Sequence, residues 1–174
     1  MPNTDNPHGF ALIGRTQGGG SIELEEFDKD ASESSAIFPN DLCHQQADGN
    51  IAPGGTPGTT IYTGVSMNYG AADTLTKHLL AAQPDALFEA QDNDDSTGLL
   101  AVDMGQNANA VFGAGDAVRI KSGHEINISG HAATATLDLR LLRLHKAVDN
   151  AFGPHARIEV LINKHTRAYG AAGI

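Results

Sequence analysis

Cysteine, tryptophan and aromatic residues in general are scarce in this sequence. Its 174 residues include a single cysteine, Cys43, and no tryptophan. A lone cysteine excludes an intrachain disulfide and a cysteine-based zinc site, and it suits a protein made in a reducing cytoplasm. Because aromatic residues make up only 5%, the core must be built from Ala, Leu, Ile and Val, which gain less on burial per side chain. We therefore expect association with a partner, or with further copies of the chain, to supply part of the stability.

Basic runs and long apolar runs are also missing. The formal net charge is −10 with only 11 Lys and Arg, and nucleic-acid binding needs clustered Lys and Arg to neutralise phosphates. The apolar runs fall well short of the ~18 residues that a membrane helix needs. The first residues, MPNTDNPHGFALIG, lack the basic and apolar regions of a signal peptide. We expect neither direct nucleic-acid binding nor a membrane partner.

Frequent turn residues and short apolar runs indicate strands rather than helices. The chain has 20 Gly and 7 Pro, and alternating apolar segments recur between them. Roughly nine to eleven short strands, with turns roughly every 8–12 residues, are typical of sandwiches and barrels. The predicted fold is all-β, a barrel or jelly-roll-like sandwich of short antiparallel strands with at most one short helix. Strands are expected at 21–27, 36–42, 61–65, 86–91, 99–103, 106–112, 117–120 and 125–128, and the mixed signals of 72–82 favour strand or irregular structure.

The clearest pattern lies in residues 132–166, which are predicted to form two longer strands around an Asn/Gly/Pro loop. In the first strand, Leu139 and Leu141 alternate with polar residues, with the period of a half-buried strand. The alternation breaks where Leu142 follows Leu141. Leu142 and Leu144 then face the opposite side of the strand, unless a β-bulge restores the register. A strand that is apolar first on one face and then on the other passes between two buried environments, so Leu142 and Leu144 are candidate intersubunit contacts.

The first 20 residues differ from the rest in being polar and rich in Gly and Pro. We predict an extended N-terminal arm over residues 1–20, which orders on contact with another surface, followed by a single β domain over 21–174. The arm carries one short apolar patch. Because exposed apolar residues on a flexible tail need a reason, Phe10, Leu12 and Ile13 are predicted to contact a partner.

One acidic cluster could hold a metal ion. Asp92, Asp94 and Asp95 stand close together, and Ca²⁺ prefers several carboxylate oxygens. Gly98, however, falls one place late for a calcium-binding EF-hand loop, and no Glu closes the site. Asp, Asn, Ser and Gly are also the residues of solvated β-turns. We favour the turn and expect no cofactor.

No arrangement of catalytic residues stands out. The 8 histidines show no His-x-His, His-x₃-His or HExxH spacing, and we expect them at scattered surface or strand-end positions. Ser66, Ser129 and Cys43 are possible nucleophiles, but none lies in a G-x-S-x-G elbow. The sequence therefore predicts a protein that is not an enzyme, with a metal-dependent hydrolase built on Asp92–Asp95 as a remote alternative.

Several stretches carry a resemblance to a known family. They are NPHGF with a Gly-rich stretch after it, FPNDL, ALFEAQDNDD followed by VDMGQNANAVFGAG, and TATLDLRLLRLHKAVDNAFGPHARIEVLINKHT. Taken in order, they resemble the cement or decoration proteins of tailed bacteriophages, small virion proteins encoded beside the major capsid protein. The specific matches cover Leu87–Gly113 and Thr134–Thr166, while a segment of the form ILGVVVGF in the family is here IYTGVSMNY.

The resemblance implies an all-β module on the outside of an icosahedral head, where such modules clamp neighbouring capsid subunits against the pressure of packaged DNA. It implies the major capsid protein as partner, synthesis in the host cytoplasm and a final location on the capsid exterior of the virion. We also expect self-association, as a dimer or trimer. Another virion role, in the neck, the tail or a receptor-facing module, is the main alternative.

Overall fold

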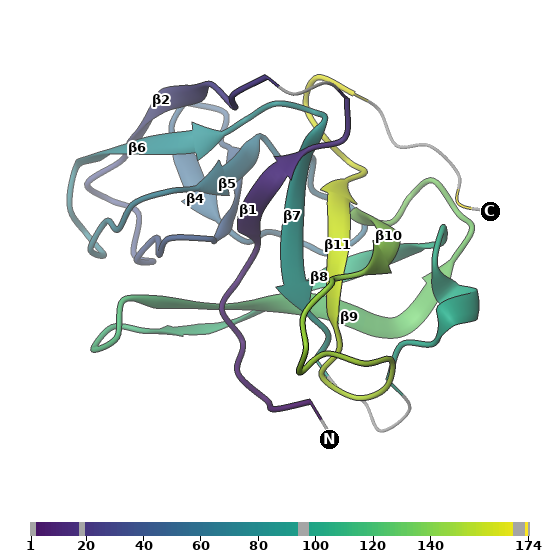
Figure 1. The fold of residues 1–174 in the computed structure, drawn as a ribbon. Coiled ribbons are helices and arrows are strands. Elements are labelled where there is room, and N and C mark those ends of the chain that lie inside the picture. Colours follow the sequence, from purple (N-terminus) through teal and green to yellow (C-terminus); the bar gives the residue numbers. More distant parts are fainter. Residues whose placement is uncertain (1–2, 18–19, 94–97, 169–172, 174) are drawn as a thin grey trace.

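Strands make up nearly all of the regular structure. A computed structural model of the chain describes residues 3–17, 20–93, 98–168 and 173. Within these residues, eleven strands form two antiparallel sheets packed together (Figure 1). The fold is therefore an all-β sandwich, as predicted, and the one helical element of the described residues is the short 3-10 helix η1 (Ala101–Asp103).

The two sheets have the following strand orders. Sheet A contains β1 (Ala11–Arg15), β7 (Ala86–Gln91), β11 (Arg157–Ile162), β10 (Leu139–Leu144), β8 (Asn107–Asp116) and β9 (Lys121–Ala132). Sheet B contains β2 (Leu24–Lys29), β6 (Thr76–Ala81), β5 (Gly64–Ser66), β3 (Leu42–Gln45) and β4 (Ile51–Pro53). Each sheet thus has two edges, and β1 and β2 are edge strands.

The main core lies between the sheets and is largely aliphatic. Its members are mostly Ala, Leu, Ile and Val, as the composition predicts, and its aromatic members are Phe10, Tyr62 and Phe88. On β11, Ile158 and Val160 are fully buried. Burying such a side chain contributes about 1.5–3 kcal/mol relative to leaving it in water. Strand alternation therefore places enough apolar surface in the core to hold the two sheets together.

The predicted closing hairpin is confirmed as β10 and β11, and it contains a β-bulge. The register of β10 against β11 shifts between Leu141 and Arg143, so Leu142 is an extra residue in β10. Leu144 thereby returns to the core side of the strand, where it packs against the core. Of the two possibilities that the sequence leaves open, the structure has the β-bulge, so Leu142 lies on the outer face and Leu144 does not.

The long hairpin of β8 and β9 differs from the sequence prediction. Strands were expected at 106–112 and 117–120 on either side of GAGD, but β8 continues through GAGD and residues 117–120 form the turn. The glycines do not form the turn but allow the two strands to approach each other closely. A Cβ on Gly113 would lie 2.4 Å from the carbonyl oxygen of Gly123 on the facing strand. In place of the strand expected at 99–103, the structure has the short helix η1. Within 72–82, where the sequence favours strand or irregular structure, it has strand β6.

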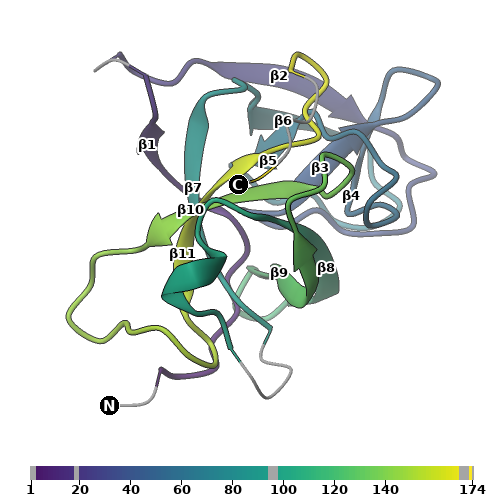
Figure 2. The ribbon, with the colours of Figure 1, turned by 90° about the vertical axis from the view of Figure 1, so that its right-hand side faces the viewer.

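The predicted free arm is wrong for the described part of residues 1–20, which belongs to the sandwich. β1 pairs with β7 in sheet A, and Phe10 is only 1% exposed. Gly9 explains how the chain turns inward, because its φ of +76° and the 2.3 Å between a built Cβ and the carbonyl oxygen of Asn40 exclude other residues. Ahead of it, the Asn3 amide donates to two carbonyls of the loop between β10 and β11. The N-terminal residues run beside that loop (Figure 2).

Candidate functional site

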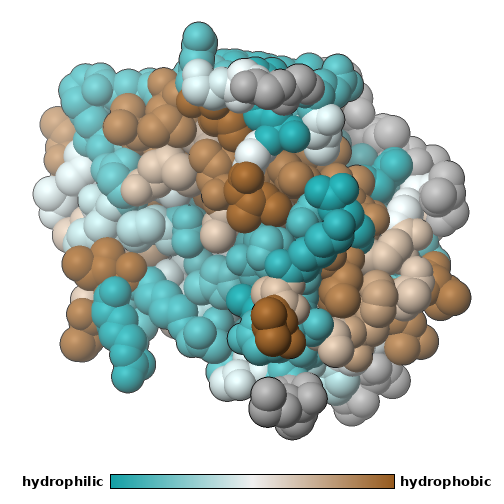
Figure 3. Space-filling view, viewed as in Figure 1, coloured by the Kyte–Doolittle hydropathy of each residue, from teal (hydrophilic) through white to brown (hydrophobic). Residues whose placement is uncertain are grey.

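An apolar groove lies beside β1 and the start of β2. β1 is an edge strand of sheet A, and β2 is an edge strand of sheet B. The groove has a volume of about 460 Å³. The groove is lined by Leu12, Ile13, Gly14, Gly20, Ser21, Ile22, Leu24 and Met67. Figure 3 shows apolar side chains gathered over β1, β2 and β6 on this face.

The groove is apolar because outward positions of the strands carry aliphatic residues. Ile13 is 39% exposed and Leu24 is 42% exposed, and Leu79 of β6 beside them is also 42% exposed. Edge strands usually carry charges that prevent pairing with another chain. On β2 these charges, Glu26 and Asp28, lie further along the strand, beyond Leu24. The part of β2 that lines the groove is therefore apolar rather than charged.

The structure separates the residues that the sequence singled out as partner contacts. Leu12 and Ile13 both line the groove, whereas Phe10 is buried in the core and cannot contact a partner in this fold. Leu142 lines a shallow hollow of about 250 Å³ on sheet A, away from the groove, together with Leu161. Sequence reasoning missed the part played by Ile22, Leu24 and Met67. The alternation of Ile22 and Leu24 was visible, but it did not show which face of the strand was covered.

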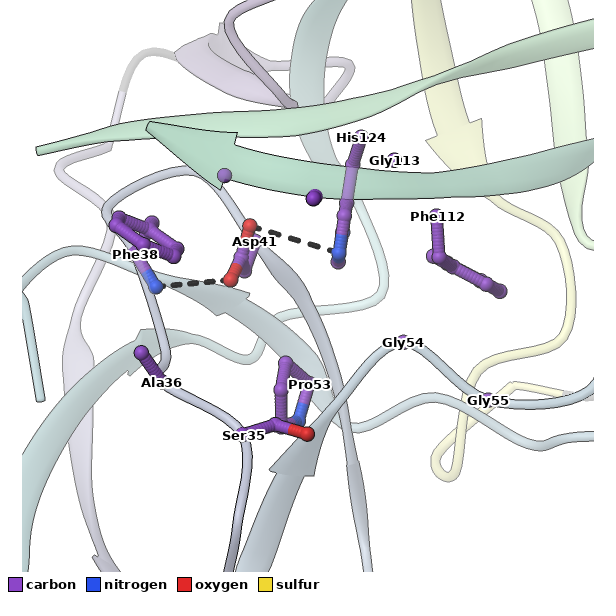
Figure 4. A pocket seen from close by; sticks show the side chains of 12 residues that line it. Ser35, Ala36, Phe38, Asp41, Pro53, Gly54, Gly55, Phe112, Gly113 and His124 are labelled. Atoms are coloured by element: carbon purple, nitrogen blue, oxygen red, sulfur yellow. Dashed lines mark hydrogen bonds and ion pairs between the residues drawn. The ribbon is translucent and has the colours of Figure 1, made fainter. Parts of the chain in front are cut away.

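A second, polar cavity lies between the β8–β9 hairpin and the loops beside β3 and β4 (Figure 4). Its volume is about 400 Å³. Asp41 and His124 form its polar side, and each is at most 5% exposed. Asp41 Oδ2 accepts the N–H of Phe38 at 2.8 Å, and Asp41 Oδ1 lies 3.5 Å from His124 Nε2. Asn40, before Asp41, has a φ of +71°, a conformation that favours Gly or Asn.

The protonation of this pair follows from burial and hydrogen bonding. The N–H of Leu42 donates to His124 Nδ1 at 3.1 Å, so the neutral ring carries its proton on Nε2. Burial lowers the pKa of His124 to about 4, which keeps the ring neutral at pH 7. Burial raises the pKa of Asp41 to about 6, against the opposing effects of the Phe38 N–H and the Ser122 hydroxyl. At pH 7, Asp41 is therefore mostly an anion beside a neutral imidazole.

Ser122 lies close to His124 and Asp41, but the three residues do not make a catalytic triad. A triad needs the ring to face the serine with one nitrogen and the carboxylate with the other. Here Nδ1 of His124 is occupied by the backbone of Leu42, and Nε2 faces Asp41. The Ser122 hydroxyl instead accepts the backbone N–H of His124 at 3.0 Å. The arrangement therefore does not activate Ser122 as a nucleophile.

The acidic cluster has a structural role at the one position that is described. Asp92 is fully buried, and its two oxygens accept the N–H groups of His155 at 2.8 Å and Ala156 at 3.1 Å. Asp94 and Asp95 lie outside the described residues. Within the described part of the chain, no group of three metal-ligating side chains occurs. Asp92 therefore fixes the loop before β11 through its hydrogen bonds.

Histidine placement also differs from the prediction of surface and strand-end positions. His78, His124 and His165 are buried. His78 lies between two hydroxyls, with Ser66 at 2.9 Å from its Nδ1 and Thr76 at 3.2 Å from its Nε2. Burial lowers the pKa of His78 to about 4. These rings act as neutral polar members of the interior.

Charged residues on the outer face of sheet A hold the N-terminal segment in place. Glu89 of β7 and Glu159 of β11 stand directly opposite each other, an arrangement that is unfavourable unless cations compensate. His8 bonds Glu89 at 3.2 Å, and Arg143 bonds Glu159 at 2.6 Å. Burial alone would raise the pKa of Glu89, but the hydrogen bond and charge of His8 bring it below its ordinary value. The N-terminal segment thus supplies part of the compensating charge.

Comparisons with models of protein families, with curated proteins and with solved structures found no match. In the described residues, no helix is long and apolar enough to cross a membrane. What the fold and its surfaces define is an all-β sandwich with an apolar groove beside β1 and the start of β2 and a separate polar cavity.

Proposed function

We propose that this protein is a virion structural protein that binds the outside of an icosahedral phage head and cements neighbouring major capsid subunits. The resemblance of residues 87–113 and 134–166 to phage cement proteins suggests this role. The observation that carries it is the apolar groove between β1 and β2, where Leu12 and Ile13 meet Leu24. An exposed apolar groove of this kind is typical of a surface that binds another protein.

In this proposal, an extended segment of the major capsid protein adds along the free edge of β1. Main-chain hydrogen bonds then supply affinity, and apolar side chains of the segment fill the groove. Ile13 and Leu24 still expose 39% and 42% of their surface. Burying that remainder contributes about 1–2.5 kcal/mol in total. One groove alone therefore binds weakly, and stable occupancy comes from avidity across a repeating lattice or from self-association as a dimer or trimer.

The direct test is occupancy on heads. Heads that lack the protein are mixed with purified wild-type chain, with Ile13→Asp or with Leu24→Asp, and bound protein is measured on a gel after sedimentation. Both variants should lose occupancy, because each places a charge in the groove, while thermal unfolding should show an intact domain. Val148→Asp is the matched control, since Val148 is fully exposed on the loop between β10 and β11.

Two outcomes would count against the proposal. Groove variants that fold and still occupy heads at the wild-type level would exclude the groove as the contact. Copy number separates a cement protein from another virion module. Binding limited to about a dozen copies per particle, rather than one for every few capsid subunits, would instead indicate a neck or tail position.

A further inference from the structure

The tip of the β8–β9 hairpin, residues 116–121, carries exposed aliphatic side chains. Val118 is 94% exposed and Ile120 is 47% exposed. The hairpin projects beyond the rest of sheet A, at the left of Figure 1. Gly, Asn, Asp and Ser are the usual residues of such turns. Two aliphatic side chains at the end of a projecting hairpin therefore indicate contact with another surface.

The backbone of the hairpin tip is fixed in a conformation that does not favour isoleucine. Oδ1 of Asp116 accepts the N–H groups of Val118 at 2.9 Å and of Arg119 at 3.0 Å. Ile120 has a φ of +52°, in the left-handed region where β-branched residues are rare. Glycine or asparagine would form this turn with less strain. The turn itself therefore does not account for Ile120, whose side chain stays about half exposed.

The hairpin tip is also a basic point on an acidic molecule. Arg119 and Lys121 stand on either side of Ile120, and Asp116 is the one acidic residue of 116–121, so two positive charges and one negative charge leave a net +1. The whole chain carries −10. The Arg119 side chain is 79% exposed, which leaves its guanidinium open to a second carboxylate besides Asp116. The complementary surface would be apolar with an acidic border.

The chain itself offers such a surface in the groove beside β1 and the start of β2. Ile13 and Leu24 line the groove and remain partly exposed. Glu23 stands in the sequence between two lining residues, Ile22 and Leu24. It is exposed and forms no ion pair with any described residue. The strand that follows it, β2, has the sequence LEEFDK and is itself acidic. Groove and hairpin tip are therefore both apolar and opposite in charge.

We propose that the hairpin tip of one copy docks into the groove of a second copy. Val118 and Ile120 then lie against the apolar lining, and Arg119 faces Glu23. The contact is head to tail, because tip and groove come from different parts of the chain, and it extends to a ring or a row of copies. One hairpin tip covers less than the ~1,200 Å² of stable interfaces, so each contact is weak.

The inference does not rest on the proposed capsid role, because it concerns the free protein. On a head, the capsid segment and the hairpin tip would compete for the groove. The experiment is therefore done without heads, and its failure would leave the capsid role standing.

The test is sedimentation equilibrium of the intact protein at concentrations up to about 1 mM. We expect self-association with a Kd on the order of 100 μM. Val118→Asp and Ile13→Asp should each weaken it at least about tenfold, because each sets a charge against apolar side chains. Leu24→Asp replaces Ile13→Asp if the latter does not fold. Val148→Asp is the matched control for Val118→Asp, since both valines are almost fully exposed, and it should leave the Kd unchanged.

A mixture of the two variants tests the head-to-tail geometry. Val118→Asp keeps an intact groove and Ile13→Asp keeps an intact hairpin tip. Together they should form a 1:1 dimer with about the wild-type affinity, although neither associates alone. A symmetric contact between two tips or two grooves would not be restored by mixing.

Charge exchange tests the pairing of Arg119 with Glu23. Arg119→Glu and Glu23→Lys should each weaken association several-fold, and the two changes in one chain should restore it. Four results would overturn the proposal: a wild type that stays monomeric at about 1 mM, association that survives both Val118→Asp and Ile13→Asp, a mixture that stays monomeric, or a double charge variant that does not recover.

Discussion

Replacement of Phe10 by alanine should destabilise the domain severely, although the sequence alone places this residue on a free arm. The side chain is 1% exposed and belongs to the main core. Truncation of a fully buried Phe to Ala destabilises by about 3–5 kcal/mol, from lost burial and the cavity left behind. Total stabilities of domains are about 5–15 kcal/mol. Phe10→Ala should therefore remove a large share of the free energy of unfolding.

The measurement is urea denaturation followed by circular dichroism, with thermal unfolding as a second probe. For a chain of this size, a loss of about 3–5 kcal/mol lowers Tm by roughly 6–20 °C. Ile13→Ala is the matched control, because Ile13 is 39% exposed on the neighbouring strand; it should change stability by less than about 1 kcal/mol. Equal, small effects of the two variants would refute the assignment of Phe10 to the core and restore the free arm.

Three further substitutions test other parts of the structure. The hydrogen bond to Glu89 raises the pKa of His8 above 6.5. The stabilisation that protonated His8 contributes is therefore present below pH 6.5 and is lost as the pH rises through the pKa of the folded state. In urea titrations, His8→Ala should cost about 0.5–1 kcal/mol at pH 5.5 and little at pH 8.5. Burial raises the pKa of Glu125 to about 7. Ionising Glu125 therefore lowers the stability of the wild type as the pH rises from 4.5 to 7. After allowing for solvent screening, Glu125→Gln should be about 1 kcal/mol more stable than wild type at pH 8 and equal to it at pH 4. Leu141→Ala should destabilise by about 2–5 kcal/mol and Leu142→Ser by less than about 1 kcal/mol in the same titrations; equal losses would contradict the placement of Leu141 in the core and of Leu142 outside it.

The sandwich itself could be predicted because alternation is a local signal. Residues 86–91 and 157–162 show an apolar pattern that depends only on neighbours in sequence, and both are strands. The bulge at Leu142 was open at the sequence level, since two adjacent leucines fit either a change of face or an extra residue. Only the facing strand β11 decides between them.

The N-terminal segment shows why composition misled the prediction. Polar, Gly-rich sequence describes both a free arm and a segment held by hydrogen bonds to distant residues. The contacts of Asn3 with Ala151 and of His8 with Glu89 join positions far apart in the chain. Nothing in the sequence of the first residues predicts these partners.

The polar cavity could not be predicted from the sequence for the same reason. Asp41 lies in the loop before β3 and His124 lies on β9, and each is unremarkable among its neighbours in sequence. One local signal was present: FPNDL, in which Asn40 takes a left-handed conformation and places Asp41 after a turn. That signal predicts a turn and says nothing of a cavity.

The position of β1 determines when sheet A can be completed during synthesis. A ribosome delivers β1 first, but β1 pairs only with β7, whose other neighbour is β11, the last strand. Until β11 emerges, β7 has a bare side and Phe10 has no finished core to enter. Nascent chains should therefore stay protease-sensitive and dependent on chaperones until β11 has left the ribosome, and folding should be slow because its pairings are distant.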